Sequence, residues 1–270
     1  MILTIIINNT LKMKKLNILS AGLALFAAAT ISSCSSISDQ EYEINGVKFK
    51  MIAVEGGSFM MGATPGQGED ARENEKPVHK VTVDDFLIGE TEVTQELWFA
   101  VMGNNPSHFK SDEGNLPVEN VSWNEVQVFI KKLNVITGQH FRLPFEAEWE
   151  YAARGGKKST DKKYSGSDDV DEVAWHKDNA NGVTHTVASK KSNEIGLYDM
   201  SGNVWEWCED WFVDYSAEEL LNPQGGIDGN DFVQRGGSYS FNGVSFARTS
   251  LRSKDKAGYV SPGVGFRMVL

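Results

Sequence analysis

The second half of this chain constrains its fold more than any other feature, because regular hydrophobic periodicity almost disappears after residue 156. Glycine, asparagine, aspartate and aromatic residues dominate there, and the whole chain contains 26 glycines and 7 tryptophans. Helices repeat apolar residues about every 3.6 positions and half-buried strands every second position. Neither pattern accounts for this region, so the sequence predicts an irregular, coil-rich fold held by tight turns and aromatic anchors.

Short strands are predicted in the first half of the chain. Apolar and polar residues alternate loosely in segment 47–54 and clearly in segment 78–83, and a further short strand is expected at 59–61. Segment 63–76 is polar and contains proline and glycine, so it predicts a surface loop.

Three helices are predicted, and residues at their ends mark their limits. They run from near Thr94 to Gly103, from Ser122 to Gly138 and from Pro144 to Gly155. Ser122 and Glu125 fit the S-x-x-E capping box of a helix N-terminus. Pro144 suits the first position of a helix, where its missing N–H has no partner to lose.

The first 33 residues predict a bacterial secretory signal. Lysines precede an apolar run from Leu16 to Ile31, which is shorter than the ~20 residues of a membrane span. The sequence Ile-Ser-Ser-Cys at 31–34 is similar to a lipobox, in which the cysteine is acylated and becomes the mature N-terminus. The alternative is an ordinary signal followed by an unrelated cysteine. Met13 begins a tidier signal than Met1 does.

The predicted organisation is a signal peptide at 1–33, a tether at 34–45 beginning at lipidated Cys34, and a domain at 46–270. We expect the lipid on Cys34 to attach the protein to the bacterial cell envelope, with the outer membrane as the expected location. Envelope proteins or peptide segments are the expected partners.

The charge of the chain argues against a nucleic-acid partner. The formal net charge is −11, and removing the signal, with its three lysines and no acid, leaves −14. Binding to phosphates requires clustered cations, and the mature chain has only small basic clusters.

Few residues are available for soft-metal or thiol chemistry. Cys34 and Cys208 are the only cysteines, so a lipidated Cys34 leaves one thiol and no internal disulfide. A lone cysteine is usually a small buried hydrophobe, which is the prediction for Cys208. The five histidines are scattered without an H-x-x-x-H spacing, which does not favour a histidine metal centre.

Several motifs in a fixed order carry a family resemblance. They are GGSFMMG at 56–62, FRLPFEAEWEYAARGG at 141–156, GLYDMSGNVWEW at 196–207, RGGSY at 235–239 and GFR at 265–267. Together they resemble the formylglycine-generating enzyme family, also called sulfatase-modifying factors, over roughly residues 50–270. The resemblance implies an irregular α+β fold related to the C-type lectin fold, with short strands and about three helices. Phe145 departs from the pattern, because the family usually has a helix-capping threonine there.

The resemblance also implies a chemistry that this sequence lacks the ligands to perform. Active members oxidise a cysteine in a sulfatase peptide with oxygen and copper(I), which two cysteines hold. The matching segment 236–252 has no cysteine, and the two positions fall near Val244 or Ser245 and near Thr249. Copper(I) prefers thiolates, and hydroxyl groups are poor replacements, so copper is not expected.

A structural calcium ion is expected from the same resemblance. Asp199 and Glu206 would supply side-chain oxygens, and Gly202 and Val204 main-chain oxygens, which are the ligands that calcium prefers. The alternative is that Glu206 and Asp210 satisfy buried main-chain donors.

A cleft for peptide is the other implied site, and its residues here would be Ser238, Tyr239, Arg248 and Arg252. Structural pairing of the two arginines is the alternative. Arg267 is expected in a buried ion pair.

Three functions remain open from the sequence. The first is a binding or assembly lipoprotein of the cell envelope with a catalytically silent domain, which the predicted anchor and the missing thiols favour. The second is an enzyme that modifies peptides or small molecules in the family cleft. The third is a formylglycine-generating oxidase that uses a noncanonical centre. Fold alone does not decide among them.

Overall fold

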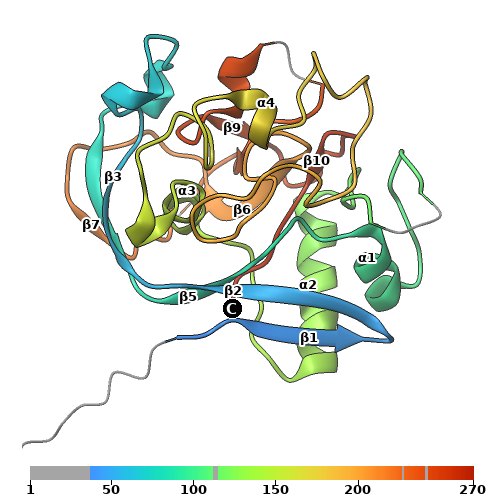
Figure 1. Ribbon diagram of the computed structural model, residues 1–270. Coiled ribbons are helices and arrows are strands. Elements are labelled where there is room, and N and C mark those ends of the chain that lie inside the picture. The colour runs from blue at the N-terminus through green and yellow to red at the C-terminus, as the bar shows by residue number, and fades with distance from the viewer. Residues whose placement is uncertain (1–36, 112–114, 227, 241–242) are drawn as a thin grey trace, which may run out of the picture. The chain divides into compact units, whose positions relative to one another are not determined.

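A computed structural model describes residues 37–270 except 112–114, 227 and 241–242. The predicted signal peptide and Cys34 lie outside the described residues. The described chain forms a mixed α+β domain of three small sheets, short helices and long irregular connections (Figure 1). The predicted fold class is therefore confirmed.

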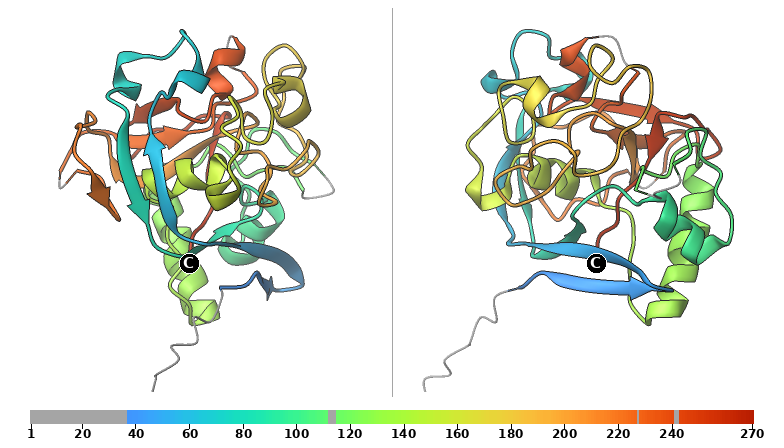
Figure 2. Two further views of the ribbon diagram at one scale, coloured as in Figure 1. Left: turned by 60° about the vertical axis from the view of Figure 1, so that its left-hand side comes forward. Right: turned by 45° about the vertical axis from the view of Figure 1, so that its right-hand side comes forward.

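The first sheet is antiparallel and has the order β1-β2-β5. Its strands are β1 (Gln40–Ile44), β2 (Val47–Val54) and β5 (Phe86–Gly89). β2 and β5 run side by side in all three views of the domain (Figures 1 and 2). The predicted strand at 47–54 is confirmed with the same limits.

Strand β1 lies inside the segment that the sequence predicted as a tether. It pairs with β2 along its whole length, and its last residue, Ile44, is buried in the core. The ring of Tyr42 stacks on Phe49 and meets the edge of Phe141. These apolar contacts explain why a short polar-looking segment joins the sheet. The ordered chain therefore begins earlier than residue 46.

The other two sheets surround the centre of the domain. One has the order β3-β4-β7 and the other the order β10-β6-β8-β9, with β7 parallel to β4 and β10 parallel to β6. The strands are β3 (Gly57–Met61), β4 (His79–Val83), β6 (Trp205–Trp211), β7 (Leu220–Leu221), β8 (Phe232–Arg235), β9 (Arg252–Asp255) and β10 (Val264–Gly265). Parallel pairing between strands distant in sequence is a feature that local pattern cannot predict.

The helices among the described residues are α1 (Gln95–Met102), α2 (Trp123–Thr137), α3 (Glu146–Ala153) and the single turn α4 (Val170–Val173). Thr94 caps α1, and the predicted capping box of Ser122 and Glu125 begins α2. Gly103 and Gly138 end these helices in the left-handed conformation that glycine adopts without steric cost. The sequence therefore predicted both ends of α1 and α2.

Helix α3 begins two residues later than predicted, so the assignment of Pro144 to the first helical position is wrong. Phe145 is the capping residue, and its side chain accepts no hydrogen bond. Two carboxylates instead accept other N–H groups at this end of the helix: Glu148 Oε2 accepts the Phe145 N–H at 2.8 Å and Asp210 Oδ2 accepts the Glu146 N–H at 2.7 Å. A negative charge at this end also favours the helix dipole.

Aromatic side chains fill the core, as the sequence indicated. Trp98 of α1 stacks on Phe129 of α2 with a centroid distance of 5.1 Å, and both meet Phe266 edge-on. Trp149 and Cys208 are completely buried in a neighbouring apolar cluster. The prediction that Cys208 is a small buried hydrophobe is confirmed.

The segment 63–76 is more than a surface loop. It contains two 3₁₀ turns, Pro65–Gln67 and Glu73–Glu75, and the side chains of Gln67 and Glu75 are completely buried. Composition predicted exposure because it gives no sign of a distant arginine partner.

No helix in the described part of the chain is long and apolar enough to cross a membrane.

Candidate functional site

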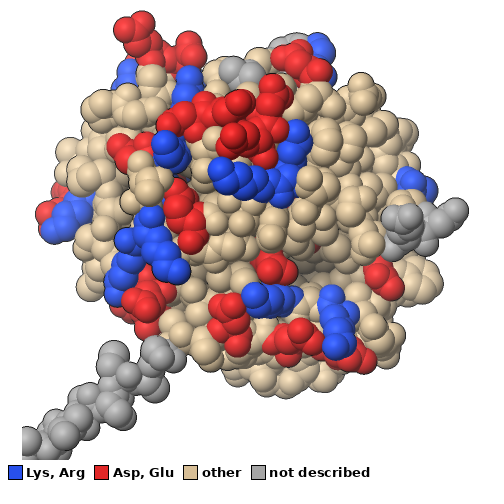
Figure 3. Space-filling model, in the orientation of Figure 1, with Lys and Arg blue, Asp and Glu red and all other residues tan. Residues whose placement is uncertain are grey.

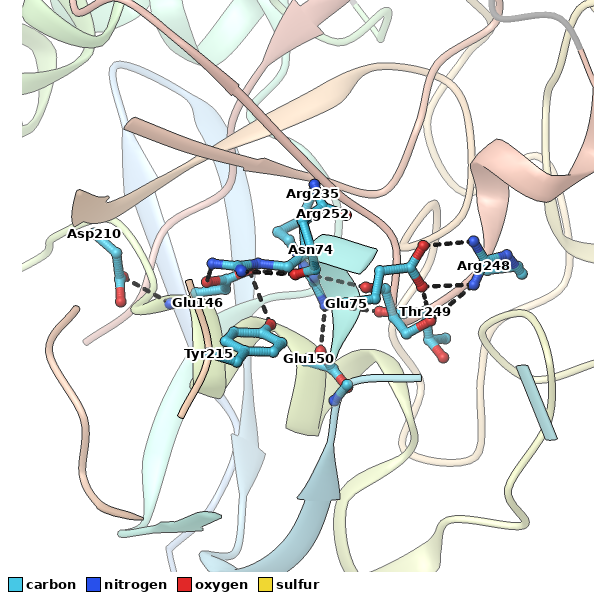
Figure 4. A network of polar contacts seen from close by, with 12 residues as sticks. Asn74, Glu75, Glu146, Glu150, Asp210, Tyr215, Arg235, Arg248, Thr249 and Arg252 are labelled. Carbon is cyan, nitrogen blue, oxygen red and sulfur yellow. Dashed lines mark hydrogen bonds and ion pairs between the residues drawn. The ribbon is translucent and has the colours of Figure 1, made fainter. Parts of the chain in front are cut away.

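A network of buried arginines and carboxylates connects segments of the chain at the centre of the domain (Figure 4). Arg235, Arg248 and Arg252 are each no more than 1% exposed, and each pairs with a glutamate. Burial of an unpaired charge is costly, whereas a paired and hydrogen-bonded charge is tolerated. The arginines therefore fix the positions of whichever segments carry their partners.

Arg248 fastens the 63–76 segment to the C-terminal part of the domain. Its Nη1 and Nη2 atoms each donate to a carboxylate oxygen of Glu75 at 2.6 Å, and Ser250 Oγ donates to the same carboxylate. Burial alone would raise the pKa of Glu75, but the hydrogen bonds from Arg248 and Ser250 outweigh it and hold this pKa below its usual value. The pair is thus fully ionised near neutral pH.

Arg252 and Arg235 hold helix α3 through its buried face. Arg252 donates from Nε and Nη2 to the two oxygens of Glu146, at 2.6 and 2.7 Å. Arg235 donates to Glu150 at 2.6 Å and lies 3.3 Å from Glu146. Sequence reasoning missed these glutamates, although their i, i+4 spacing on an otherwise apolar helix face was an available signal.

All four residues that the sequence assigned to a peptide cleft are buried in the structure. Arg248 and Arg252 are held in the ion pairs described above. Ser238 is buried, with its Oγ 3.2 Å from Ser240 Oγ. Tyr239 is 8% exposed and meets the edge of the Phe109 ring. The arginines therefore present no free guanidinium to a peptide, which favours their structural role.

The residues near the expected copper positions have no soft ligand. Thr249 is buried, and its carbonyl accepts a hydrogen bond from Arg235. Ser245 lies in a 3₁₀ turn, Val244–Ala247, and its carbonyl accepts from Arg248. Burial raises the pKa of the Cys208 thiol well above its usual value, so this cysteine stays protonated and unreactive.

A second buried cluster of charges surrounds the expected calcium residues. Arg267 donates to both oxygens of Glu206 at 2.7 Å, and the Trp149 indole donates to Glu206 Oε2. Glu92 accepts from the backbone N–H of Val204, and Asp199 Oδ2 accepts from that of Ala188. The prediction that Arg267 forms a buried ion pair is confirmed.

Carboxylates outnumber arginines in this cluster. Glu92, Asp199 and Glu206 are buried together with one arginine, Arg267. Burial, with the nearby carboxylates, raises the pKa of Glu92 well above its usual value, and burial raises the pKa of Asp199 to about 6. Asp199 Oδ1 is buried and accepts no hydrogen bond among the described residues.

The cluster contains oxygen atoms of the type that calcium prefers. Asp199 Oδ1 is an uncommitted oxygen, and two excess carboxylates match a divalent ion. Glu206 is already bound by Arg267 and Trp149, so it would have to share its remaining lone pairs. No group of three or more His, Cys, Asp or Glu side chains in the described residues is placed so that it could hold a metal ion.

Comparison with known proteins identifies the family that has this architecture. The family model described as "Sulfatase-modifying factor enzyme 1-like domain" matches residues 41–270. The chain belongs to the sulfatase-modifying-factor family. This family match begins inside β1, in agreement with the ordered start of the domain.

Two curated relatives of the family represent different roles. The "Chaperone protein LppX" of Paenibacillus barcinonensis is 32% identical, and the match covers 92% of this chain and 96% of that protein. The "Formylglycine-generating enzyme" of Streptomyces coelicolor is 30% identical, with 80% of this chain and 87% of the enzyme covered.

A solved structure of the same fold is "Treponema denticola variable protein 1". It is 33% identical, has a TM-score of 0.78, and the match covers 86% of this chain and 98% of that one. The matches to these three proteins each cover at least 80% of this chain.

Replacing Glu75 with glutamine tests the ion pair with Arg248. We expect Glu75→Gln to lower the free energy of unfolding at pH 7 by about 3 kcal/mol, because a buried arginine is left without its partner. Because the folded-state pKa of Glu75 is lowered, its contribution is present at neutral pH and is lost as the pH falls through that value. The stability difference between native protein and variant should therefore begin to shrink below the usual glutamate pKa of about 4.3 and vanish below the lowered pKa of folded Glu75, measured by denaturant unfolding.

Glu73→Gln is the matched control. Glu73 lies in the same 3₁₀ turn but its side chain is 92% exposed and pairs only with Lys76. Its replacement should leave stability nearly unchanged at every pH. A Glu75→Gln variant as stable as the control at pH 7 would contradict the role given to the pair.

Proposed function

We propose that this protein is a cell-envelope lipoprotein whose sulfatase-modifying-factor domain binds other proteins or assists their assembly, without copper oxidase chemistry. One observation carries the proposal. The segment that matches the copper-binding region of active relatives offers Val244, Ser245 and Thr249, whose side chains include no thiol. A copper(I) centre of two thiolates therefore cannot form from this segment.

The state of Cys208 supports the same conclusion. It is the one cysteine among the described residues and is fully buried. Its thiol lies among Asp210, Glu146 and Glu206, whose negative charges oppose thiolate formation. A reactive cysteine needs exposure and a lowered pKa, so Cys208 does not replace the missing pair.

A relative covered over nearly its full length is named a chaperone, which supports a protein-binding role. The similar coverage of a formylglycine-generating enzyme is the observation that supports the enzymatic alternative. On the face drawn in Figure 3, lysine and arginine alternate with acidic side chains and form no wide basic field. That distribution gives no support for a nucleic-acid partner.

An oxidation assay separates the proposal from its enzymatic alternative. The purified protein would be incubated with copper(I), oxygen and a peptide that carries the sulfatase Cys-x-Pro-x-Arg motif, and mass spectrometry would follow conversion of the cysteine to an aldehyde. We expect no conversion above a protein-free control, while a formylglycine-generating enzyme converts the same peptide. Turnover by this protein would overturn the proposed absence of oxidase chemistry.

Attachment to the envelope depends on Cys34 in this proposal. In a bacterial host fed an alkyne-labelled fatty acid, the native chain should acquire label and sediment with membranes, whereas Cys34→Ser should do neither. Cys208→Ala is the matched control, because it removes the other thiol but should keep the lipid.

Cross-linking in the same cells tests the partner. The native chain and the control should yield the same discrete adduct with an envelope protein, and Cys34→Ser should lose it. Lipid label on Cys34→Ser, or no specific adduct on the native chain, would count against the proposal.

We also propose that calcium binds at Asp199 and Glu206 with the main-chain oxygens of Gly202 and Val204. The ion would neutralise the excess carboxylate charge of this cluster. A ligand that binds only the folded state stabilises it by about 2.7 kcal/mol at 100 times its dissociation constant. This corresponds to roughly 5–10 °C in melting temperature for a domain of this size.

Differential scanning fluorimetry in calcium and in chelator measures this effect. The native protein should melt at a higher temperature in calcium, and Asp199→Ala should lose the difference. Asp178→Ala, which replaces an exposed aspartate, should retain it. Identical melting temperatures of the native protein in calcium and in chelator would exclude the site.

A further inference from the structure

A pocket of about 300 Å³ opens between the end of β6, the segment 213–225 and the start of α3. Much of its wall is apolar and includes Met61, Val213, Leu220 and Pro223. Ligand pockets range upward from about 300 Å³, so this one suits a side chain or a small molecule. Ser238 and Tyr239, expected in the peptide cleft, are not among its lining residues.

A buried carboxylate with one uncommitted oxygen lies in this pocket. Asp210 is 4% exposed, and its Oδ2 accepts the backbone N–H of Glu146. Its Oδ1 accepts no hydrogen bond from any described residue, although Asp210 lines the pocket. Figure 4 shows the carboxylate apart from the arginines and joined only to the Glu146 backbone. This oxygen is not among the fully buried atoms that lack a partner, so it is open to the pocket and can accept a donor that enters there.

The other charged groups at the pocket do not supply that donor. Arg252 also lines it, but its guanidinium is engaged by Glu146, Asn74 O and Val213 O. Asp214 adds a second negative charge at an exposed position. The charges of Arg252 and Glu146 cancel each other, so the remaining acidic side chains give the pocket a net negative charge.

Histidine adds a further acceptor. His79 lines the pocket and is 3% exposed, and its Nδ1 lies 3.1 Å from Pro77 O. A carbonyl only accepts hydrogen bonds, so Nδ1 carries the proton and, in the neutral ring, Nε2 is left as an acceptor. Ser216 and Gln224 are the lining side chains that can donate or accept according to the ligand.

We propose that this pocket binds a primary ammonium group on an apolar stem, the lysine side chain of a peptide, with the Asp210 carboxylate as its counter-ion. The stem would lie against the apolar wall while the ammonium donates to Asp210 Oδ1. A guanidinium fits less well, because its two parallel hydrogen bonds require both carboxylate oxygens. Asp210 Oδ2 is already bound to the start of α3.

Proton release on binding is a consequence of this arrangement. Burial, together with the charge of Glu146, raises the pKa of Asp210 well above its usual value. A bound cation favours the ionised carboxylate. Binding of the lysine ammonium should therefore lower the pKa of Asp210 and release a proton at any pH at which the empty pocket carries one on this carboxyl.

Titration of the full chain with blocked amino acids tests the proposal. N-acetyl-lysine N-methylamide should give saturable chemical-shift changes in the NMR spectrum at residues around the pocket. The norleucine analogue, which has the stem without the charge, and the arginine analogue should each bind at least about tenfold more weakly. Equal binding of lysine and norleucine, or no saturable binding of lysine, would overturn the proposal.

Asp210→Asn is the matched variant, because its amide oxygen can still accept the Glu146 N–H while the charge is removed. It should weaken lysine binding at least about tenfold, whereas Asp214→Asn at the exposed rim should weaken it less than about threefold. Unchanged binding by Asp210→Asn would contradict the proposed counter-ion.

A second measurement on the native protein covers the case in which Asp210→Asn does not fold. Calorimetric titrations of lysine analogue in buffers of different ionisation enthalpy should reveal release of up to one proton for each ligand bound. The titrations would be repeated from acid to neutral pH, and binding without proton release at every pH would exclude Asp210 as the group that meets the ammonium.

Discussion

The pairing of buried glutamates with buried arginines is the constraint on which the rest of this structure depends. Glu146 and Glu150 lie one turn apart on α3, and Arg235 and Arg252 reach them from adjacent strands, β8 and β9. A buried charge without its partner is strongly unfavourable, so these strands and the helix can pack in only one arrangement. Connections without regular hydrogen bonding are thereby held in place in a domain that has no disulfide among its described residues.

Local signals in the sequence were sufficient where a structure depends on neighbouring residues. The capping box of Ser122 and Glu125 predicted the start of α2, and Gly138 its end, because caps act over a few residues. The late start of α3 was missed, since Asp210, which accepts its first N–H, is 64 residues away. The burial of Glu75 was missed for the same reason, because its partner Arg248 is 173 residues away.

The features of the candidate site likewise fall into those that the sequence could predict and those that it could not. Identity of the residues in segment 236–252 was enough to predict the missing copper ligands, whatever their geometry. The ion pairs of Arg248 and Arg252 could be recognised only in the folded chain, because the sequence does not distinguish a free arginine from a paired one. In this chain the charge pairs hold a fold whose segment 236–252 has no thiol, and the fold alone does not decide its use.

If Cys34 carries the proposed lipid, the early start of β1 limits how far the domain can move from the bilayer. Gln40 follows Cys34 by six residues in the sequence, and an extended chain spans at most about 3.5 Å per residue. With a lipid on Cys34, the first strand would lie within roughly 20 Å of the bilayer surface. Such a short connection would allow the domain to rotate but would keep it close to the bilayer. The partners within its reach would therefore be proteins that are themselves at the membrane.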